Sequence, residues 1–285
     1  MRFTRLAFDA ESFRTNRFLV VRLPILVAAS TIAAALTLGP WIIATVYLYW
    51  QWFHYTRQSY GISRMYLRKA GRTVPSTDLP TFGVIYVVPL LGILRRSVQN
   101  PDHFLGMQLS ALPVPPQALL PVAVLAAASF LIWAVREAAA YARGDTDGLY
   151  ACYVLSHVAV FTTGYLLIFD IDRGWLVLNI WHNAQYVLIV WMHNTNRFRD
   201  GVDPAHPFLS TISQRRHAPL YFAVCIGLAT VLYLAVQHGL SLLASQMISA
   251  SLAGYMIINF HHYIVDAIIW RRRRMIGPQK SSAAS

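Results

Sequence analysis

Long apolar runs alternate with short polar or basic connections along almost the whole chain. A membrane helix needs roughly 20 mostly apolar residues, and about eight runs approach or reach that length. The predicted spans cover residues 19–38, 40–56, 80–94, 116–135, 150–169, 175–195, 218–237 and 245–270. Turn-forming residues such as Gly39-Pro40 separate neighbouring runs. The pattern therefore predicts an all-α, polytopic membrane helical bundle.

The third run is the shortest and ends in Arg95-Arg96, a pattern that a re-entrant segment would also show. Charge distribution decides between the two, because cytoplasmic loops collect Lys and Arg. With eight crossings and a cytoplasmic N-terminus, only Arg95, Arg96 and Arg173 of the 24 basic residues lie outside. A re-entrant third run would instead expose most of the later basic loops. We therefore expect eight spans with both termini cytoplasmic, in a bacterial inner membrane.

This topology divides the chain into three parts. Residues 1–18 form a basic amphipathic segment that we expect at the membrane surface. Residues 19–270 form one transmembrane domain, and residues 271–285 form a cytoplasmic tail. The segments 57–72 and 97–115 are predicted to be a basic inner loop and an irregular outer loop.

Composition supports the membrane assignment. Of 285 residues, 56% are hydrophobic and 13% are charged, whereas about 25% of the residues of a soluble domain are charged. This excludes a soluble enzyme, a disordered chain and a disulfide scaffold. The net charge of +12 is a topology signal here and does not indicate a nucleic-acid partner.

Candidate chemistry lies in polar stripes on three predicted spans. Residues three, four, seven or eleven apart share a helix face. The stripes are Tyr47, Gln51, His54 and Gln58 on the second span, Asn179, His182, Tyr186 and His193 on the sixth, and Tyr255, Asn259, His262 and Asp266 on the eighth. Lipid does not tolerate such polar faces, so we expect them to line a cavity that opens toward the cytoplasm. His157 adds a weaker fourth face, and His261 lies about 100° around the helix from His262.

Imidazoles in a buried cavity predict a metal site, because histidine is the commonest ligand of iron, copper and zinc. The candidate ligands are His54, His157, His182, His193, His261, His262 and Asp266. Gln58, Asn179, Tyr186 and Asn259 are candidates for orienting these ligands by hydrogen bonds. Arg57, beside His54, is the candidate for binding a phosphate or another acidic headgroup at the cavity mouth.

The segment Asn259-Phe260-His261-His262-Tyr263 resembles part of a histidine box, and Trp181-His182-Asn183 and His193-Asn194 do so more loosely. In this respect the chain resembles polytopic, histidine-rich membrane iron oxygenases, a class that includes fatty-acid desaturases, alkane hydroxylases, carotenoid ketolases and carotene dioxygenases. It departs from the desaturase pattern, since it has no HxxxH or HxxHH motif. The resemblance implies only a chemistry class: mononuclear or dinuclear iron, O₂ and a lipid or isoprenoid-like substrate.

Three other interpretations of the same residues stay open. The stripes would also suit a proton or substrate pathway in a transporter, although no inverted repeat is visible and Asp266 is the one clear carboxylate within a span. Two facing histidines could hold haem, which would leave the accompanying Asn, Gln and Tyr residues unexplained. A single histidine in a span commonly serves as a hydrogen-bond partner between helices.

Overall fold

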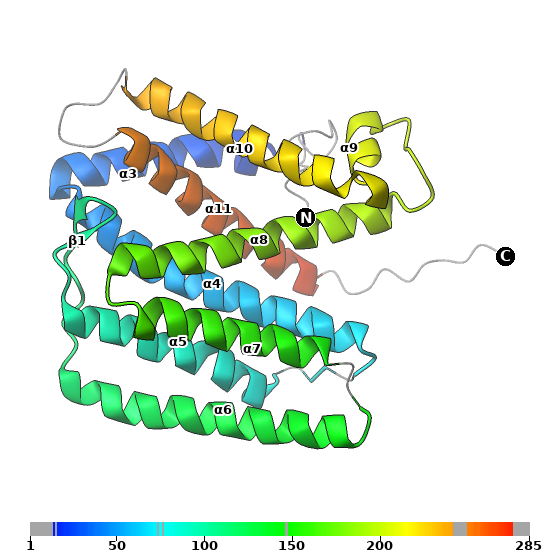
Figure 1. The fold of residues 1–285 in the computed structure, drawn as a ribbon. Helices are drawn as coiled ribbons and strands as arrows, with labels where there is room; N and C mark the ends of the chain where they lie inside the picture. Colours follow the sequence, from blue (N-terminus) through cyan, green and yellow to red (C-terminus); the bar gives the residue numbers. More distant parts are fainter. Residues whose placement is uncertain are drawn as a thin grey trace. The chain divides into compact units, whose positions relative to one another are not determined.

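The computed structural model describes residues 14, 16–72, 74–75, 77–145, 148–241 and 250–275. The structure is 81% helical, which confirms the predicted all-α class (Figure 1). The strands in the described part are β1 (His103–Phe104) and β2 (Met107–Gln108), which form one short antiparallel hairpin. Most of the predicted interfacial segment 1–18 and most of the predicted tail 271–285 lie outside the described residues.

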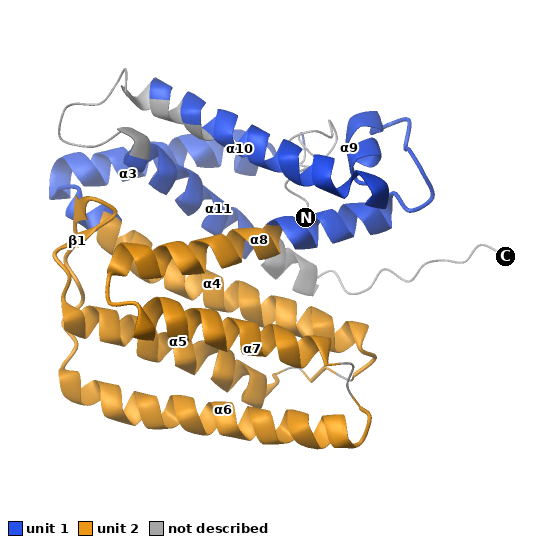
Figure 2. Cartoon of the chain, in the orientation of Figure 1, with its two compact units in different colours: residues 1–43, 187–285 blue, residues 44–186 orange. Residues whose placement is uncertain are grey.

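The chain divides into two compact units, which Figure 2 colours separately. Unit 1 comprises residues 1–43 and 187–285, and unit 2 comprises residues 44–186. Two long helices contribute to both units. These are α4 (Trp41–Lys69) and α8 (Ile171–Arg197).

Unit 2 contains most of α4, the first part of α8 and the helices between them. These are α5 (Leu79–Gln99), the 3₁₀ turn η2 (Pro116–Ala118), α6 (Leu119–Ala142), α7 (Leu149–Phe161) and the π-helix η3 (Thr162–Leu167). α5 is central within this unit, because it packs against α6, α7 and η3.

Unit 1 contains the N-terminal helices and the C-terminal helical pair. Its elements are the π-helix η1 (Phe18–Arg22), α3 (Leu23–Leu38), α9 (Pro207–Ile212), the 3₁₀ turn η4 (Arg215–His217), α10 (Ala218–Ser241) and α11 (Ala250–Met275). α11 packs against both α3 and α10. Gly39 ends α3 with φ 98°, a conformation that favours glycine, and so supplies the predicted turn before Pro40.

Four described helical segments are long and apolar enough to cross a membrane, which indicates a membrane protein. They are Phe18–Leu38, Leu79–Gln99, Pro116–Ala142 and Leu149–Leu167. The second of these corresponds to the short third run, whose helix is 21 residues long once Arg95 and Arg96 are included. The polar stripes lie on α4, α8 and α11, which contain 29, 27 and 26 residues.

The structure corrects both predicted loops. Residues 57–69 continue α4 and do not form a loop. This stretch has no proline and contains several good helix formers, so the helix continues until the turn at Gly71, where φ is 72°. The outer segment 97–115 is partly ordered as well, because α5 extends to Gln99 and the β1–β2 hairpin follows.

Arg95 and Arg96 have a structural role that the sequence did not reveal. The Arg96 side chain is 1% exposed, and its guanidinium donates to the carbonyl oxygens of Gly164 at 2.7 Å and Ile168 at 2.6 Å. Arg95 donates to the carbonyl oxygens of Tyr165 and Leu166. Carbonyls at the end of a helix lack intrahelical partners, and the Nη groups of the two arginines supply them at the end of η3.

A second polar group, here called the ionic cluster, joins the start of α5 to α6 and α7. It consists of Arg72, Asp78, Thr81, Arg136, Glu137 and Tyr150. Asp78 caps α5 by accepting a hydrogen bond from the Thr81 backbone N–H and also pairs with Arg136. Glu137 binds Arg136 at 3.0 Å and Arg72 at 2.8 Å. The cluster therefore ties three helices together at one end of unit 2.

Replacing Asp78 should reveal how much the ionic cluster contributes to the free energy of unfolding. Burial raises the pKa of Asp78, but the hydrogen bonds from Arg136 and Thr81 outweigh burial and hold the pKa below its ordinary value. The stabilisation is then complete above the unfolded pKa of about 3.9 and is lost as the pH falls through the lower folded pKa. We expect the free energy of unfolding of Asp78→Asn to be about 3 kcal/mol lower than that of the wild type at pH 7. In strong acid the two free energies should be equal. Denaturation of the variant and the wild type in detergent at a series of pH values measures both the loss at pH 7 and the equality in acid.

The control is Asp145→Asn, which breaks the exposed pair of Asp145 with Arg143. An exposed pair contributes less than about 1 kcal/mol. An equal effect of the two substitutions at pH 7 would contradict a stabilising role for the ionic cluster.

In unit 2 the backbone at Gly174 lies close to the backbone at Gly164, and this contact gives a second prediction. A Cβ atom built on Gly174 would overlap the carbonyl oxygen of Gly164 and lie 2.7 Å from Arg96 Nη2. Since backbone cannot move aside cheaply, Gly174→Ala should destabilise the fold by about 2 kcal/mol. Gly227→Ala is the control, because its Cβ would meet no described atom within 4 Å, and alanine favours a helix by about 0.5–1 kcal/mol. Thermal unfolding in detergent compares them, and similar melting temperatures would contradict the close contact.

Candidate metal centre

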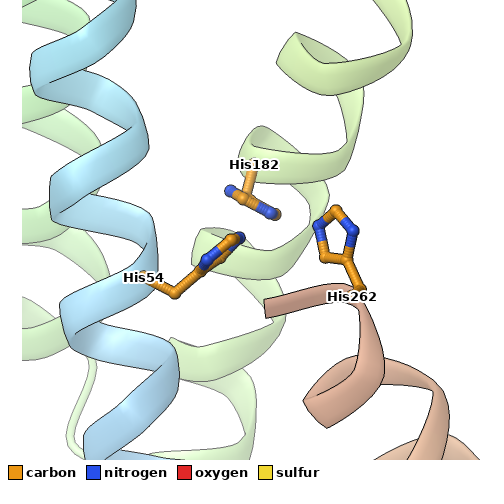
Figure 3. A group of neighbouring side chains, drawn as sticks. All are labelled: His54, His182 and His262. Carbon is orange, nitrogen blue, oxygen red and sulfur yellow. The ribbon is translucent and has the colours of Figure 1, made fainter. Parts of the chain in front are cut away.

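Two buried imidazoles of unit 2 form the core of the candidate site. His54 lies on α4 and is 7% exposed, and His182 lies on α8 and is 3% exposed. Their ring centroids are 5.2 Å apart and the rings meet edge to face. Figure 3 shows the two rings turned toward each other from their separate helices. The sequence predicted that these two stripes would meet, and within unit 2 they do.

Tyr55 fixes the position of the His182 ring. The two rings stack with centroids 3.8 Å apart and an angle of 17° between their planes. The Tyr55 hydroxyl donates a hydrogen bond of 2.7 Å to Asn179 Oδ1, which also accepts one from Asn183. Asn179 thus accepts a hydrogen bond from Tyr55, which stacks on His182, whereas the sequence predicted a hydrogen bond from Asn179 to a metal ligand. Tyr55 itself was missed because it is an aromatic residue beside the stripe of α4 and looks like packing.

The whole polar stripe of α4 is buried. The exposed fraction is 0% for Tyr47, 1% for Gln51, 7% for His54 and 6% for Gln58. Both amide atoms of Gln58 and the Nε2 of Gln51 have no hydrogen-bond partner in the described part of the chain. Burying an amide without a partner costs about 1–3 kcal/mol. These two amides flank His54 along α4, which marks this face as the place where a bound ion, water or substrate would supply the missing contacts.

His157 has a different environment. It is fully buried on α7, and its Nε2 lies 3.1 Å from the carbonyl oxygen of Ile85 on α5. Its ring packs against Phe161, with centroids 4.4 Å apart. This is the contact between helices that one buried histidine commonly makes. Arg57 and Tyr186, also in unit 2, are half-buried on α4 and α8.

The candidate ligands of unit 1 lie mainly on α11. His262 Nε2 is 3.8 Å from Asp266 Oδ2, and Asp266 is 8% exposed. This confirms that the two side chains share a helix face. His261 points elsewhere, because its Nε2 lies 3.0 Å from the carbonyl oxygen of Leu19 in η1. Asn259 donates to the Tyr255 carbonyl within the same helix, at 2.8 Å. His193 is half-buried on the last part of α8.

Chemically, His54 and His182 offer imidazole nitrogen ligands, and the side-chain amides of Gln51 and Gln58 lie on the same buried face of α4 as His54. Such a set suits iron, copper or zinc better than magnesium or calcium, which prefer oxygen ligands alone. No protein-family model, curated protein or solved structure matches the chain. The functional argument therefore depends on the site.

The amide of Gln58 gives a test of this interpretation. Gln58→Leu removes a buried amide that has no partner in the described chain, so we expect the metal-free protein to gain about 1 kcal/mol of stability. Gln214→Leu is the matched control, because its Nε2 donates to the carbonyl oxygens of Phe198, Gly201 and Ser210 at 3.0–3.2 Å. The control should lose about 1–3 kcal/mol in the same thermal denaturation. A loss of similar size for Gln58→Leu would show that the amide already has partners.

Proposed function

We propose that this protein is an integral membrane, metal-dependent oxidoreductase that uses iron and O₂ to oxidise a lipid or isoprenoid-like substrate. The observation that carries the proposal lies within unit 2, where the buried imidazoles of His54 and His182 meet with ring centroids 5.2 Å apart. Iron bound there would supply the O₂ chemistry, while the protein would bind and orient the substrate and exclude water.

Each residue has a separate role in this proposal. His54 and His182 are the ligands in unit 2, and His262 and Asp266, which share a face of α11, are the ligand candidates that the sequence predicts in unit 1. Tyr55, held by Asn179, keeps the His182 ring in place. The amides of Gln51 and Gln58 hydrogen-bond water or substrate beside the ion. His157 and His261, each close to a backbone carbonyl, are positioning residues for their helices.

The proposed setting is a bacterial inner membrane, with both termini in the cytoplasm. In this arrangement α4, α8, α10 and α11 also cross the bilayer, which completes eight spans. The polar stripes are then shielded from lipid, as the high cost of ionisable groups in a membrane requires. Arg57 on α4 would bind the acidic headgroup of a lipid substrate.

Metal analysis of the purified protein tests the proposal. We expect one or two iron ions per chain by mass spectrometry, with no Soret band in the visible spectrum. His54→Ala, His182→Ala and His262→Ala should each reduce bound iron at least tenfold, which corresponds to about 1.4 kcal/mol or more of binding free energy. His103→Ala is the control, because His103 lies in the exposed β1–β2 hairpin, and it should keep the full iron content.

Three outcomes would overturn the proposal. Iron that survives all three substitutions would place the metal elsewhere. A Soret band would indicate a haem protein. No stoichiometric metal, even after reconstitution under reducing conditions, would favour a transporter that uses the same polar residues.

A further inference from the structure

Three aromatic rings in unit 2 stack in series from three different helices. Trp181 on α8 stacks on Tyr153 of α7, with centroids 6.3 Å apart and an angle of 22° between the planes. Tyr153 then stacks on Tyr66 of α4, with centroids 5.2 Å apart and an angle of 28°. We call Trp181, Tyr153 and Tyr66 the aromatic ladder. The first ring belongs to the residue next to His182, so a covalent path joins the ladder to a proposed metal ligand.

The ladder leads from a buried position to the end of α4. Tyr153 is 9% exposed and its hydroxyl donates to Gln185 Oε1 at 3.4 Å. Tyr66 is half-buried and is followed within three residues by the exposed, basic Arg68 and Lys69 that end the helix. Trp and Tyr are the side chains that give up one electron most readily without a metal.

We propose that the aromatic ladder conducts single electrons between the end of α4 and the metal centre. This inference rests on the proposed function for its physiological direction. A metal held there would accept one electron from Trp181, whose indole would become a radical cation and keep its N–H proton. Tyr153 then gives one electron to the Trp181 radical cation while its phenol proton shifts along the hydrogen bond to Gln185 Oε1, and the proton returns when Tyr66 passes one electron to Tyr153. At the outer ring the phenol of Tyr66 releases its proton to solvent, and an external one-electron reductant, together with a proton from solvent, restores it.

Photo-oxidation of metal-free protein tests the ladder without any enzyme assay. A ruthenium polypyridyl photo-oxidant is attached to the single cysteine of a Lys69→Cys, Cys152→Ser, Cys225→Ser variant, and an external quencher generates Ru(III) by a laser flash. Ru(III) takes one electron from the ladder and becomes Ru(II). We expect a tryptophan radical in transient absorption and electron paramagnetic resonance. Trp181→Phe should abolish this signal while tyrosyl radical still forms.

Conservative variants separate conduction from packing. Tyr153→Phe keeps the ring and its packing but removes the oxidisable phenol, so transfer to Trp181 should slow by an order of magnitude or more. Tyr153→Trp restores an oxidisable ring and should recover the rate. Tyr86→Phe is the control, since Tyr86 stacks on Phe82, outside the ladder, and should leave the rate unchanged.

The result is independent of whether iron binds. A Trp181 radical whose rate depends on Tyr153 would support the ladder even if metal analysis failed and the proposed function fell. Unchanged kinetics in Tyr153→Phe, or a radical that persists in Trp181→Phe, would overturn the ladder while leaving the metal proposal intact.

Discussion

The absence of water around membrane-embedded backbone and side chains is the constraint on which the rest of this structure depends. Each polar group there needs a partner inside the protein, because exposure to lipid costs several kcal/mol. Arg95 and Arg96 meet this need for the carbonyls at the end of η3. The ionic cluster meets it for Asp78 and Glu137. Unit 2 therefore contains buried charges, and the described structure provides each with a partner of suitable chemistry.

The need for a partner inside the protein divides the histidines into two groups. His157 and His261 each lie within hydrogen-bond distance of a backbone carbonyl, which gives them a structural role. His54 and His182 instead face each other, and α4 buries two glutamine amides on the face that carries His54. Replacing either glutamine with an apolar residue would remove a buried amide whose missing hydrogen bonds cost about 1–3 kcal/mol. These two amides are therefore part of the candidate site on α4 and not of the hydrogen-bond network of the described chain.

The sequence predicted the helical class and the polar stripes because both depend on periodicity alone. Spacing of three, four and seven residues placed His54 and Gln58 on one buried face and paired His262 with Asp266, and the structure confirms these placements. The extension of α4 through residue 69 was missed because basic residues suggested a loop, whereas helix propensity and the lack of proline decided the outcome.

Other features depend on which helices become neighbours, and a single sequence does not carry that information. Asp78 and Arg136 are 58 residues apart, and Arg96 contacts carbonyls about 70 residues away. Tyr55 and the aromatic ladder likewise combine side chains from separate helices. In the sequence each of these residues resembles a span-end charge or a packing aromatic. Their roles arise only when close helix packing, permitted by Gly164 and Gly174, brings backbone and side chains from different segments together.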